Sequence, residues 1–354
     1  MADTIPNLPA TTHKMDTAFT HTWYEMRQKA IDNILDANVL TAALRANGCF
    51  MKQIGGRHIA RTIRYGTKTA THIKDGDTLP TGKDEADTQA LFNWKTTQTH
   101  VQRSYHEDQQ NQGPSKIKDL VQTKLEMARD ALETDFENSL MTAVDTDGGK
   151  ELRATEDPYS IQNLMPEISD GTAGVPTSTY GAPAAADSYT YGRVDRNNTW
   201  WQPKGVKGTA PALMNLEADM KSLYNYCTAG GTDHPNLIVT EQRLHEAYED
   251  ICAARIQIVA DVGSPLAKLG FEVLKYRGAQ VIYTTNSAID SRNAMFFLNT
   301  KWIDIVYDPT SWFQMIPFQY LPNSLTRVAR IVCTWTGMIS GQMRRHGCTG
   351  PIAS

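Results

Sequence analysis

The chain has 354 residues and a net charge of −4, with 40% hydrophobic and 21% charged residues. These values are typical of an ordinary soluble globular protein, long enough for two domains or for one large domain with extensions. The negative charge argues against a dedicated nucleic-acid-binding protein, because such proteins usually carry a strongly basic face.

The chain shows neither a signal-peptide pattern nor an apolar run near the roughly 20 residues that cross a bilayer. We therefore expect a cytosolic protein with no membrane partner. Its cysteines are scattered and show no CxxC spacing, which predicts buried, inert thiols rather than disulfides or a zinc site. They are Cys49, Cys227, Cys252, Cys333 and Cys348.

Residues 17–47 are helix-prone and predict an N-terminal arm with one or two helices. Residues 58–105 then predict a long ribbon of two extended runs around a charged turn. Ile59, Ile63 and Tyr65 share one face of the outgoing run, because side chains alternate along a strand, and Phe92 and Trp94 pair with them on the return. The distal half has little to bury, and isolated two-stranded ribbons are marginal in water. The ribbon is thus either a flexible surface hairpin or a segment docked on another subunit.

The clearest helix is predicted over residues 115–144, after Pro114 and an N-cap at Ser115, with Asp147 and Gly148 marking its end. At about 1.5 Å per residue it would run on the order of 40 Å. It suits either a core helix or a structural rod. Its apolar residues recur at helical spacing: Ile117, Leu120, Val121, Leu125, Ala128, Leu132, Phe136, Leu140 and Ala143.

The same helix carries an acidic face. Its spacing would suit a metal in a helix bundle, but no matching ligands occur elsewhere, so we interpret it as a solvated or partner-facing surface. Its residues are Glu126, Asp130, Glu133 and Glu137.

Residues 159–191 are rich in Gly, Ala, Ser, Thr and Pro and predict a long exposed loop. The adjacent Trp200 and Trp201 that follow can bury a large area at a domain junction, or could form a stacking platform for a carbohydrate or base.

The second half alternates helices and strands. We predict a helix over 211–228, a strand at NLIVT, a helix at EQRLHEAYEDICAAR, strands at FEVLKY and AQVIYTT joined by Arg277-Gly278, and a strand at MFFLN. Residues 312–336 are mostly extended and could return to pack on the long helix. This pattern indicates the α+β class.

No catalytic motif occurs. GDTLPTGKD departs from the phosphate-loop pattern, and GxGxxG, GxSxG and HExxH are absent. His58, His72, His100 and His106 lie in the polar ribbon without partners at ligand spacing, so we interpret them as surface histidines. We expect no catalytic residue, no cofactor, no metal site and no enzymatic activity.

The outgoing run of the ribbon is basic, whereas the second half of the long helix is acidic. Ribbon and helix are therefore candidates for complementary contact between neighbouring copies, where charge sets register and rate more than affinity. The basic residues are Arg57, Arg61, Arg64, Lys68 and Lys74.

Several segments occur in a recognisable order between about residues 55 and 350: GGRHI, ALFNWK, HEDQQNQGPSKIKDL, YGRVDRNNTWW, PNLIVT, GFEVLKYRGAQVIY, MFFLNTKWI and RHGCTG. In this order the chain resembles the major capsid protein of tailed double-stranded-DNA bacteriophages, which has the Hong Kong 97-like fold.

The resemblance implies a division of the chain: an N-terminal arm (1–54), an extended loop formed by the ribbon (55–108), a peripheral domain (109–203) with a spine helix (115–144) and a Gly-rich loop (159–191), an axial domain (204–320), and a return to the peripheral domain (321–354). It also implies inter-subunit contacts by the acidic face of the spine helix and by these residues of the extended loop: Arg61, Arg64, Tyr65, Lys68, Lys74, Phe92 and Trp94.

The implied function is self-assembly into hexamers and pentamers that form an icosahedral shell around the phage genome. Implied partners are the portal, possibly separate scaffolding and decoration proteins, and packaged double-stranded DNA held by weak non-specific contact. The location would be the virion, after assembly in the host cytoplasm. Some relatives crosslink a ribbon lysine to an asparagine, but nothing singles out a pair among Lys68, Lys74, Lys83 and Asn323.

Two alternatives stay open. One is an encapsulin, a nanocompartment shell of the same fold that encloses an enzyme. The other is a soluble α+β enzyme with a lid loop at residues 171–191, which would need convergent titratable residues.

Overall fold

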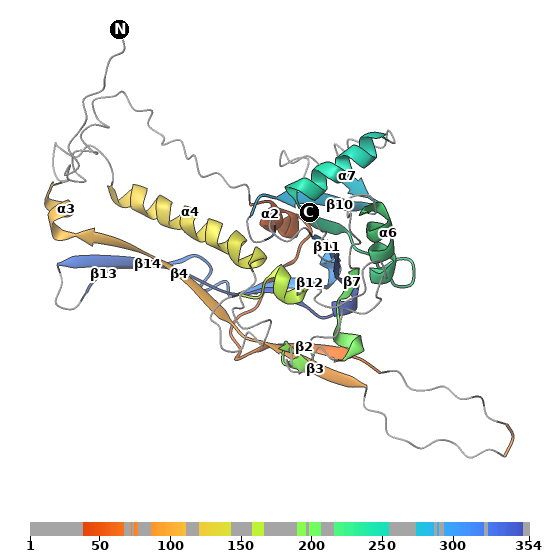
Figure 1. Cartoon of the computed structure of the whole chain (residues 1–354). Helices are drawn as coiled ribbons and strands as arrows, with labels where there is room; N and C mark the ends of the chain where they lie inside the picture. The colour runs from red at the N-terminus through yellow and green to blue at the C-terminus, as the bar shows by residue number, and fades with distance from the viewer. Residues whose placement is uncertain are drawn as a thin grey trace, which may run out of the picture.

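The structure is a computed structural model, and Figure 1 shows its arrangement. It contains two large sheets packed with helices and two short two-stranded ribbons, so the predicted α+β class is confirmed. The residues described are 38–66, 72, 74–76, 86–110, 120–142, 158–165, 190–195, 198–206, 216–254, 274–286, 289, 294–321 and 325–349.

The five-stranded sheet is built around β14 (Thr326–Ser340), a strand of 15 residues. The second half of β14 pairs antiparallel with β12 (Ile303–Tyr307), which pairs in parallel with β1 (Phe50–Lys52). Its first half lies between β13 (Gln314–Tyr320) and β4 (Lys95–Ser104), both antiparallel. The late extended segment therefore returns to pack on the long helix, as predicted, through contacts between β14 and α4 (Leu120–Met141).

The long helix α4 (Leu120–Met141) packs on this sheet. Its 22 residues span about 33 Å at 1.5 Å per residue. Ala128 and Leu132 are buried against β4 and β14, and the ring of Phe136 stacks on Trp335 of β14 at 3.9 Å. The predicted apolar stripe is confirmed over the described part of the helix, whereas its predicted N-cap at Ser115 lies outside the described residues.

The second sheet has six strands, and its central ones are buried on both faces. Its strands are in the order β7 (Lys204–Val206), β15 (Gly347–Thr349), β11 (Met295–Leu298), β8 (Leu237–Glu241), β10 (Ala279–Thr284) and β9 (Leu274–Tyr276).

Neighbouring residues of β8 serve two different cores. Ile238 belongs to the core formed with α6 (Leu216–Cys227) and α7 (Gln242–Ala254), and Val239 belongs to the main core on the other face. Helix α2 (Val39–Ala46) contacts β10 from the main-core side. Burial on both faces explains why these strands are continuous apolar runs in the sequence.

The predicted elements of the second half are confirmed where the structure describes them. NLIVT forms β8, and the helix after it is α7. Arg277 and Gly278 have φ of 48° and 88°, the geometry of a tight two-residue turn, and join β9 to β10. The remaining short elements are β2 (Ile59–Arg64), β3 (Asp87–Phe92), α3 (Tyr105–Gln110), α5 (Ile161–Leu164), β5 (Thr190–Tyr191), β6 (Val194–Asp195), η2 (Thr199–Trp201), η4 (Thr300–Trp302) and η5 (Met343–Arg345).

The predicted ribbon of residues 58–105 is shorter in the structure. β2 and β3 pair antiparallel, from Ile59 opposite Phe92 to Arg64 opposite Asp87. The next segment, β4, instead pairs with β14 along its whole length. The return strand therefore ends at Phe92, and Trp94 lies beyond the last ribbon pair. The reason is that β14 offers β4 a complete antiparallel edge, which the outgoing strand does not.

The predicted loop of residues 159–191 also differs at its start. Ser160 caps α5 through a capping box with Asn163, and Leu164 is fully buried. The backbone of Tyr159 pairs with β14 at Gly337. Residues 166–189 lie outside the described part of the chain.

Candidate assembly surfaces

The base of the ribbon, formed by β2 and β3, is anchored on its own chain. Ile63 and Ala90 are buried in the main core. Phe92 is fully buried, with its ring edge-on to those of Tyr159 and Tyr191 at 5.3 and 5.2 Å. The expected inter-subunit role of Phe92 is therefore wrong for its side chain, because its apolar surface is already used inside the chain.

Arg61 of the ribbon base has a partner on the same chain. Its Nη2 lies 2.5 Å from Oδ2 of Asp304 on β12, and both side chains are partly shielded from solvent. Burial raises the pKa of Asp304, and the Arg61 guanidinium counteracts this rise. Arg61 thus connects the ribbon base to the five-stranded sheet, and its guanidinium already forms an ion pair within its own chain.

The other predicted ribbon contacts lie at or near the surface. Arg64 makes an exposed 3.4 Å ion pair with Asp87 across the ribbon. The Trp94 indole donates a hydrogen bond to the Gly56 carbonyl at 2.8 Å. Lys74 is exposed, whereas Lys68 lies outside the described residues.

The two predicted tryptophans have different environments. Trp201 is buried, and its Nε1 donates to the Tyr191 carbonyl at 3.0 Å. Trp200 stacks on Tyr65 with ring centroids 4.8 Å apart. Trp201 is thus a core residue, and one face of Trp200 is occupied by a ring of the ribbon base.

The acidic residues of α4 do not form one uniform surface. Glu126 and Asp130 are exposed, and Glu133 pairs with Arg129 at 3.0 Å. Glu137 is buried and accepts hydrogen bonds from the backbone N–H groups of Leu40 and Thr41 at 2.8 and 2.9 Å. The expected partner-facing role of Glu137 is therefore wrong, because this carboxylate caps the first turn of α2.

The basic ribbon base and the acidic helix are not brought together within the chain. Figure 1 shows α4 and β2–β3 leaving the body of the molecule in different directions. Contact between their charged surfaces would therefore require a second copy. The structure leaves that prediction untested.

Strand β13 is an exposed edge that sequence reasoning did not assign to a surface. Within the described residues it pairs only with β14, and Met315 and Tyr320 are 47% and 63% exposed. Leu321, directly after β13, and Leu325, directly before β14, are also exposed. The available signal was Pro317, because proline inside an extended run favours an edge strand.

The described residues include no group of three or more His, Cys, Asp or Glu placed to hold a metal ion. No described helix is long and apolar enough to cross a membrane. All five cysteines are free and buried, as expected for inert thiols. Burial raises the pKa of Cys49 and of Cys333 to about 12, which favours the protonated thiol at neutral pH.

Neither a protein-family model nor a curated protein matches the sequence. Solved structures do match it. The capsid protein of cyanophage A-1(L) has a TM-score of 0.59 and 15% identity, over 95% of this chain and 98% of that one. The capsid protein of Myoviridae phage XM1 has a TM-score of 0.56 and 11% identity, over 93% and 97%. The SrpI encapsulin of Synechococcus elongatus PCC 7942 has a TM-score of 0.54 and 10% identity, over 95% of each chain.

The chain therefore has the fold of phage capsid proteins, over nearly its full length. An encapsulin shell protein shares this fold. At these identities the likeness identifies the architecture.

Proposed function

We propose that the chain is the major capsid protein of a tailed bacteriophage, and that copies of it assemble into hexamers and pentamers of an icosahedral shell. The observation that carries this proposal is the match to phage capsid folds over 95% of the chain. It is a structural rather than an enzymatic role.

The surfaces described above support this proposal. The ribbon base carries the exposed charged side chains of Arg64 and Asp87, and β13, which pairs only with β14 among the described strands, exposes Met315 and Tyr320. Exposed strand edges readily pair with other chains, which fits assembly. The exposed Asp130 of α4 and Arg64 of the ribbon base have the complementary charges for contact between copies.

In this proposal α4 is the spine of a peripheral domain, the six-stranded sheet with α6 and α7 is the core of the axial domain, and the ribbon lies on the adjacent subunit. Expansion during genome packaging would move these units as packed bodies. Portal, scaffolding and decoration proteins and weakly held DNA complete the list of partners. The particle would be found as a virion, after assembly in the host cytoplasm.

Electron microscopy of the purified full-length chain tests the proposal. We expect closed shells or ring-shaped capsomers. A chain that stays monomeric at every concentration tested, with the ribbon folded onto its own body, would contradict assembly and would favour the soluble-enzyme alternative.

The encapsulin match supports a second candidate, a shell that encloses an enzyme. Particles isolated from the cells that encode the chain separate the two functions. Nuclease-protected DNA inside the particles supports a phage shell, whereas a protein cargo without DNA supports a nanocompartment.

A further inference from the structure

A basic cavity lies beside the ribbon base, where β7, η5 and the C-terminal end of α6 meet. Its volume is about 340 Å³, roughly that of ten liquid water molecules at about 30 Å³ each. Four of its lining residues are cationic, and none of the described residues that line it is acidic. The cations are Arg64, Lys204, Arg344 and Arg345.

Two of these cations have carboxylate partners outside the cavity lining. Arg345 lies 3.3 Å from Asp233, and Arg64 makes its exposed pair with Asp87. Arg344 is exposed, and within the described part of the chain it makes no ion pair with a carboxylate. Arg344 therefore contributes a positive charge to the cavity that no described carboxylate pairs with.

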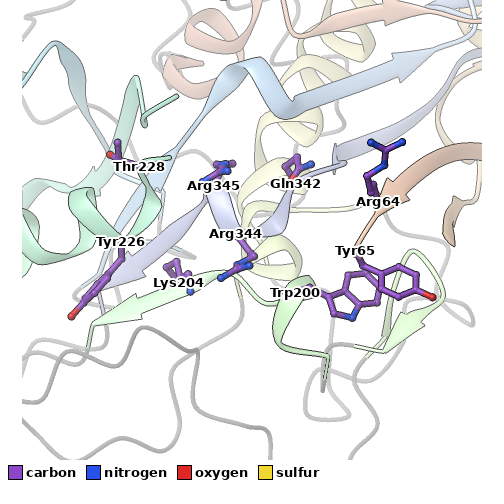
Figure 2. Close-up of a pocket in the computed structure, with 9 residues that line it drawn as sticks. All are labelled: Arg64, Tyr65, Trp200, Lys204, Tyr226, Thr228, Gln342, Arg344 and Arg345. Carbon is purple, nitrogen blue, oxygen red and sulfur yellow. The ribbon is translucent and has the colours of Figure 1, made fainter. Parts of the chain in front are cut away.

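The cations also oppose one another. Burial and the nearby guanidinium groups of Arg344 and Arg345 lower the pKa of Lys204. Figure 2 shows the side chains of Lys204 and Arg344 close together in the middle of the cavity. An anion placed between them would relieve this repulsion and would be attracted by both.

The walls of the cavity are aromatic and polar. Figure 2 shows Tyr226 on one side of the Lys204 and Arg344 pair and the stacked Trp200 and Tyr65 rings on the other. Gln342 adds an amide to the lining. These groups limit access from two sides and leave the positive charge at the centre.

We propose that this cavity binds phosphate groups, either of a free oligophosphate or of consecutive nucleotides in a nucleic acid. A phosphate monoester concentrates about −1.5 to −2 charges on one compact group, whereas a carboxylate brings a single charge. Arginine side chains match the geometry of phosphate oxygens with paired N–H donors. The cavity has room for more than one such group.

An acidic protein segment would also carry negative charge, but each carboxylate brings a single charge, so two of them would have to enter together to match one phosphate group. The chain has a net charge of −4, and the positive charge described here is confined to this cavity. This distribution does not indicate a surface that binds along a DNA duplex. The inference goes beyond the proposed shell function and does not depend on it, because all described walls of the cavity come from one chain.

Binding of pyrophosphate to the purified full-length chain tests the inference, by calorimetry at constant ionic strength with chloride as the balancing anion. We expect Arg344→Ser to weaken binding by about tenfold, because a charge-assisted hydrogen bond is lost. Arg330→Ser is the matched control, because Arg330 is an exposed arginine on β14 that does not line the cavity. No binding to the unaltered chain, or equal loss in both variants, would overturn the inference.

A single-stranded oligonucleotide of about ten nucleotides distinguishes the two sources of phosphate. Binding that pyrophosphate displaces, and that Arg344→Ser weakens, assigns the site to nucleic-acid phosphates. Binding of pyrophosphate alone assigns it to a free oligophosphate. Particle formation by both variants is scored separately by electron microscopy, so a failure to form shells would contradict the proposed function without affecting the site.

Discussion

At the scale of single residues, Glu137 shows how one carboxylate joins distant parts of the sequence. The N–H groups in the first turn of a helix have no partner inside the helix, and a negative charge at that end is favourable. Glu137 of α4 supplies both an acceptor and a charge to α2, whose backbone N–H groups at Leu40 and Thr41 it binds. The segment that follows the N-terminal arm is therefore fixed to the long helix.

Replacing Glu137 with alanine should lower the free energy of unfolding by about 2 kcal/mol, because two backbone N–H groups lose their acceptor in a buried site. Glu133→Ala is the matched control. That side chain is partly exposed in an i,i+4 pair, which is worth less than about 0.5 kcal/mol. Urea unfolding monitored by circular dichroism gives both values, and equal losses in the two variants would contradict the capping role.

The same residue predicts a pH dependence. Burial raises the pKa of Glu137 above its ordinary value of 4.5, although its hydrogen bonds to Thr41 and Leu40 counteract this. The folded chain therefore keeps this proton at a pH where the unfolded chain has released it. The contribution of Glu137 to stability is complete below pH 4.5 and decreases as the pH rises to the folded pKa. Glu137→Gln cannot titrate and should show a weaker decline in unfolding free energy over this interval.

Gly337 is a second residue whose identity is set by a close backbone approach. Its φ is +86°, and an added Cβ would lie 2.3 Å from the carbonyl oxygen of Tyr159. Gly337→Ala should cost at least about 3 kcal/mol or prevent folding, since both the backbone conformation and the space exclude a side chain. Gly341→Ala is the control, because a Cβ there meets nothing within 4 Å. Soluble yield and melting temperature check this, and a stable Gly337→Ala variant would contradict the strand pairing between Tyr159 and β14.

Among the helices and strands, the local sequence pattern was enough to predict an element where the side chains of that segment determine its structure. The apolar stripe of α4 and the apolar run of β8 are examples. The helical spacing of the first and the continuous hydrophobicity of the second can both be recognised within a short stretch of sequence. The Arg277-Gly278 turn between β9 and β10 is also local.

Strand β4 shows where local pattern fails. Its ten residues include Val101 as the one buried aliphatic side chain, and they look like the return of the ribbon. Its partner β14 begins more than 200 residues later in the sequence, and the backbone hydrogen bonds that pair the two strands carry no sequence signature. The capping role of Glu137 was missed for the same reason, since its acceptor function depends on a helix about a hundred positions away.

The ribbon allows a test of assembly without loss of the fold. Gly66 and Ala86 are already joined, because the Gly66 N–H donates to the Ala86 carbonyl at 3.2 Å. Replacing residues 67–85 with Asn-Gly should therefore close the ribbon in a tight hairpin turn. The change in stability should be below about 1 kcal/mol, since shortening a loop has a small entropic effect.

Particle formation by this truncated chain should fall by at least about tenfold, because each lost contact is repeated at every subunit. Light scattering and electron microscopy measure the particles, and circular dichroism confirms the fold. Normal shells from a folded truncated chain would contradict the docking role of the ribbon. The Lys74→Ser variant, whose ribbon keeps its full length, is the control. It shows whether loss of one charge is enough to reduce particle formation or whether the whole segment has to be lost.

At the scale of the whole molecule, the two cores share one sheet. Ile238 and Val239 are adjacent on β8, yet they serve the core with α6 and α7 and the main core, respectively. If β8 leaves the sheet, apolar side chains of both cores become exposed to water at the same time. The two parts of the chain should therefore unfold together, although the sequence predicts separate domains.

The cysteines allow this coupling to be measured. Cys49, Cys333 and Cys348 are in the main core, and Cys227 and Cys252 are in the other. In the native chain none should react with a thiol reagent, because all are at most 6% exposed and burial raises the pKa of Cys49, Cys227 and Cys333. In partial denaturant, mass spectrometry should find chains with no label and chains with all five, because the shared sheet makes opening cooperative. A large population labelled only at Cys227 and Cys252 would instead mean that the core with α6 and α7 opens alone.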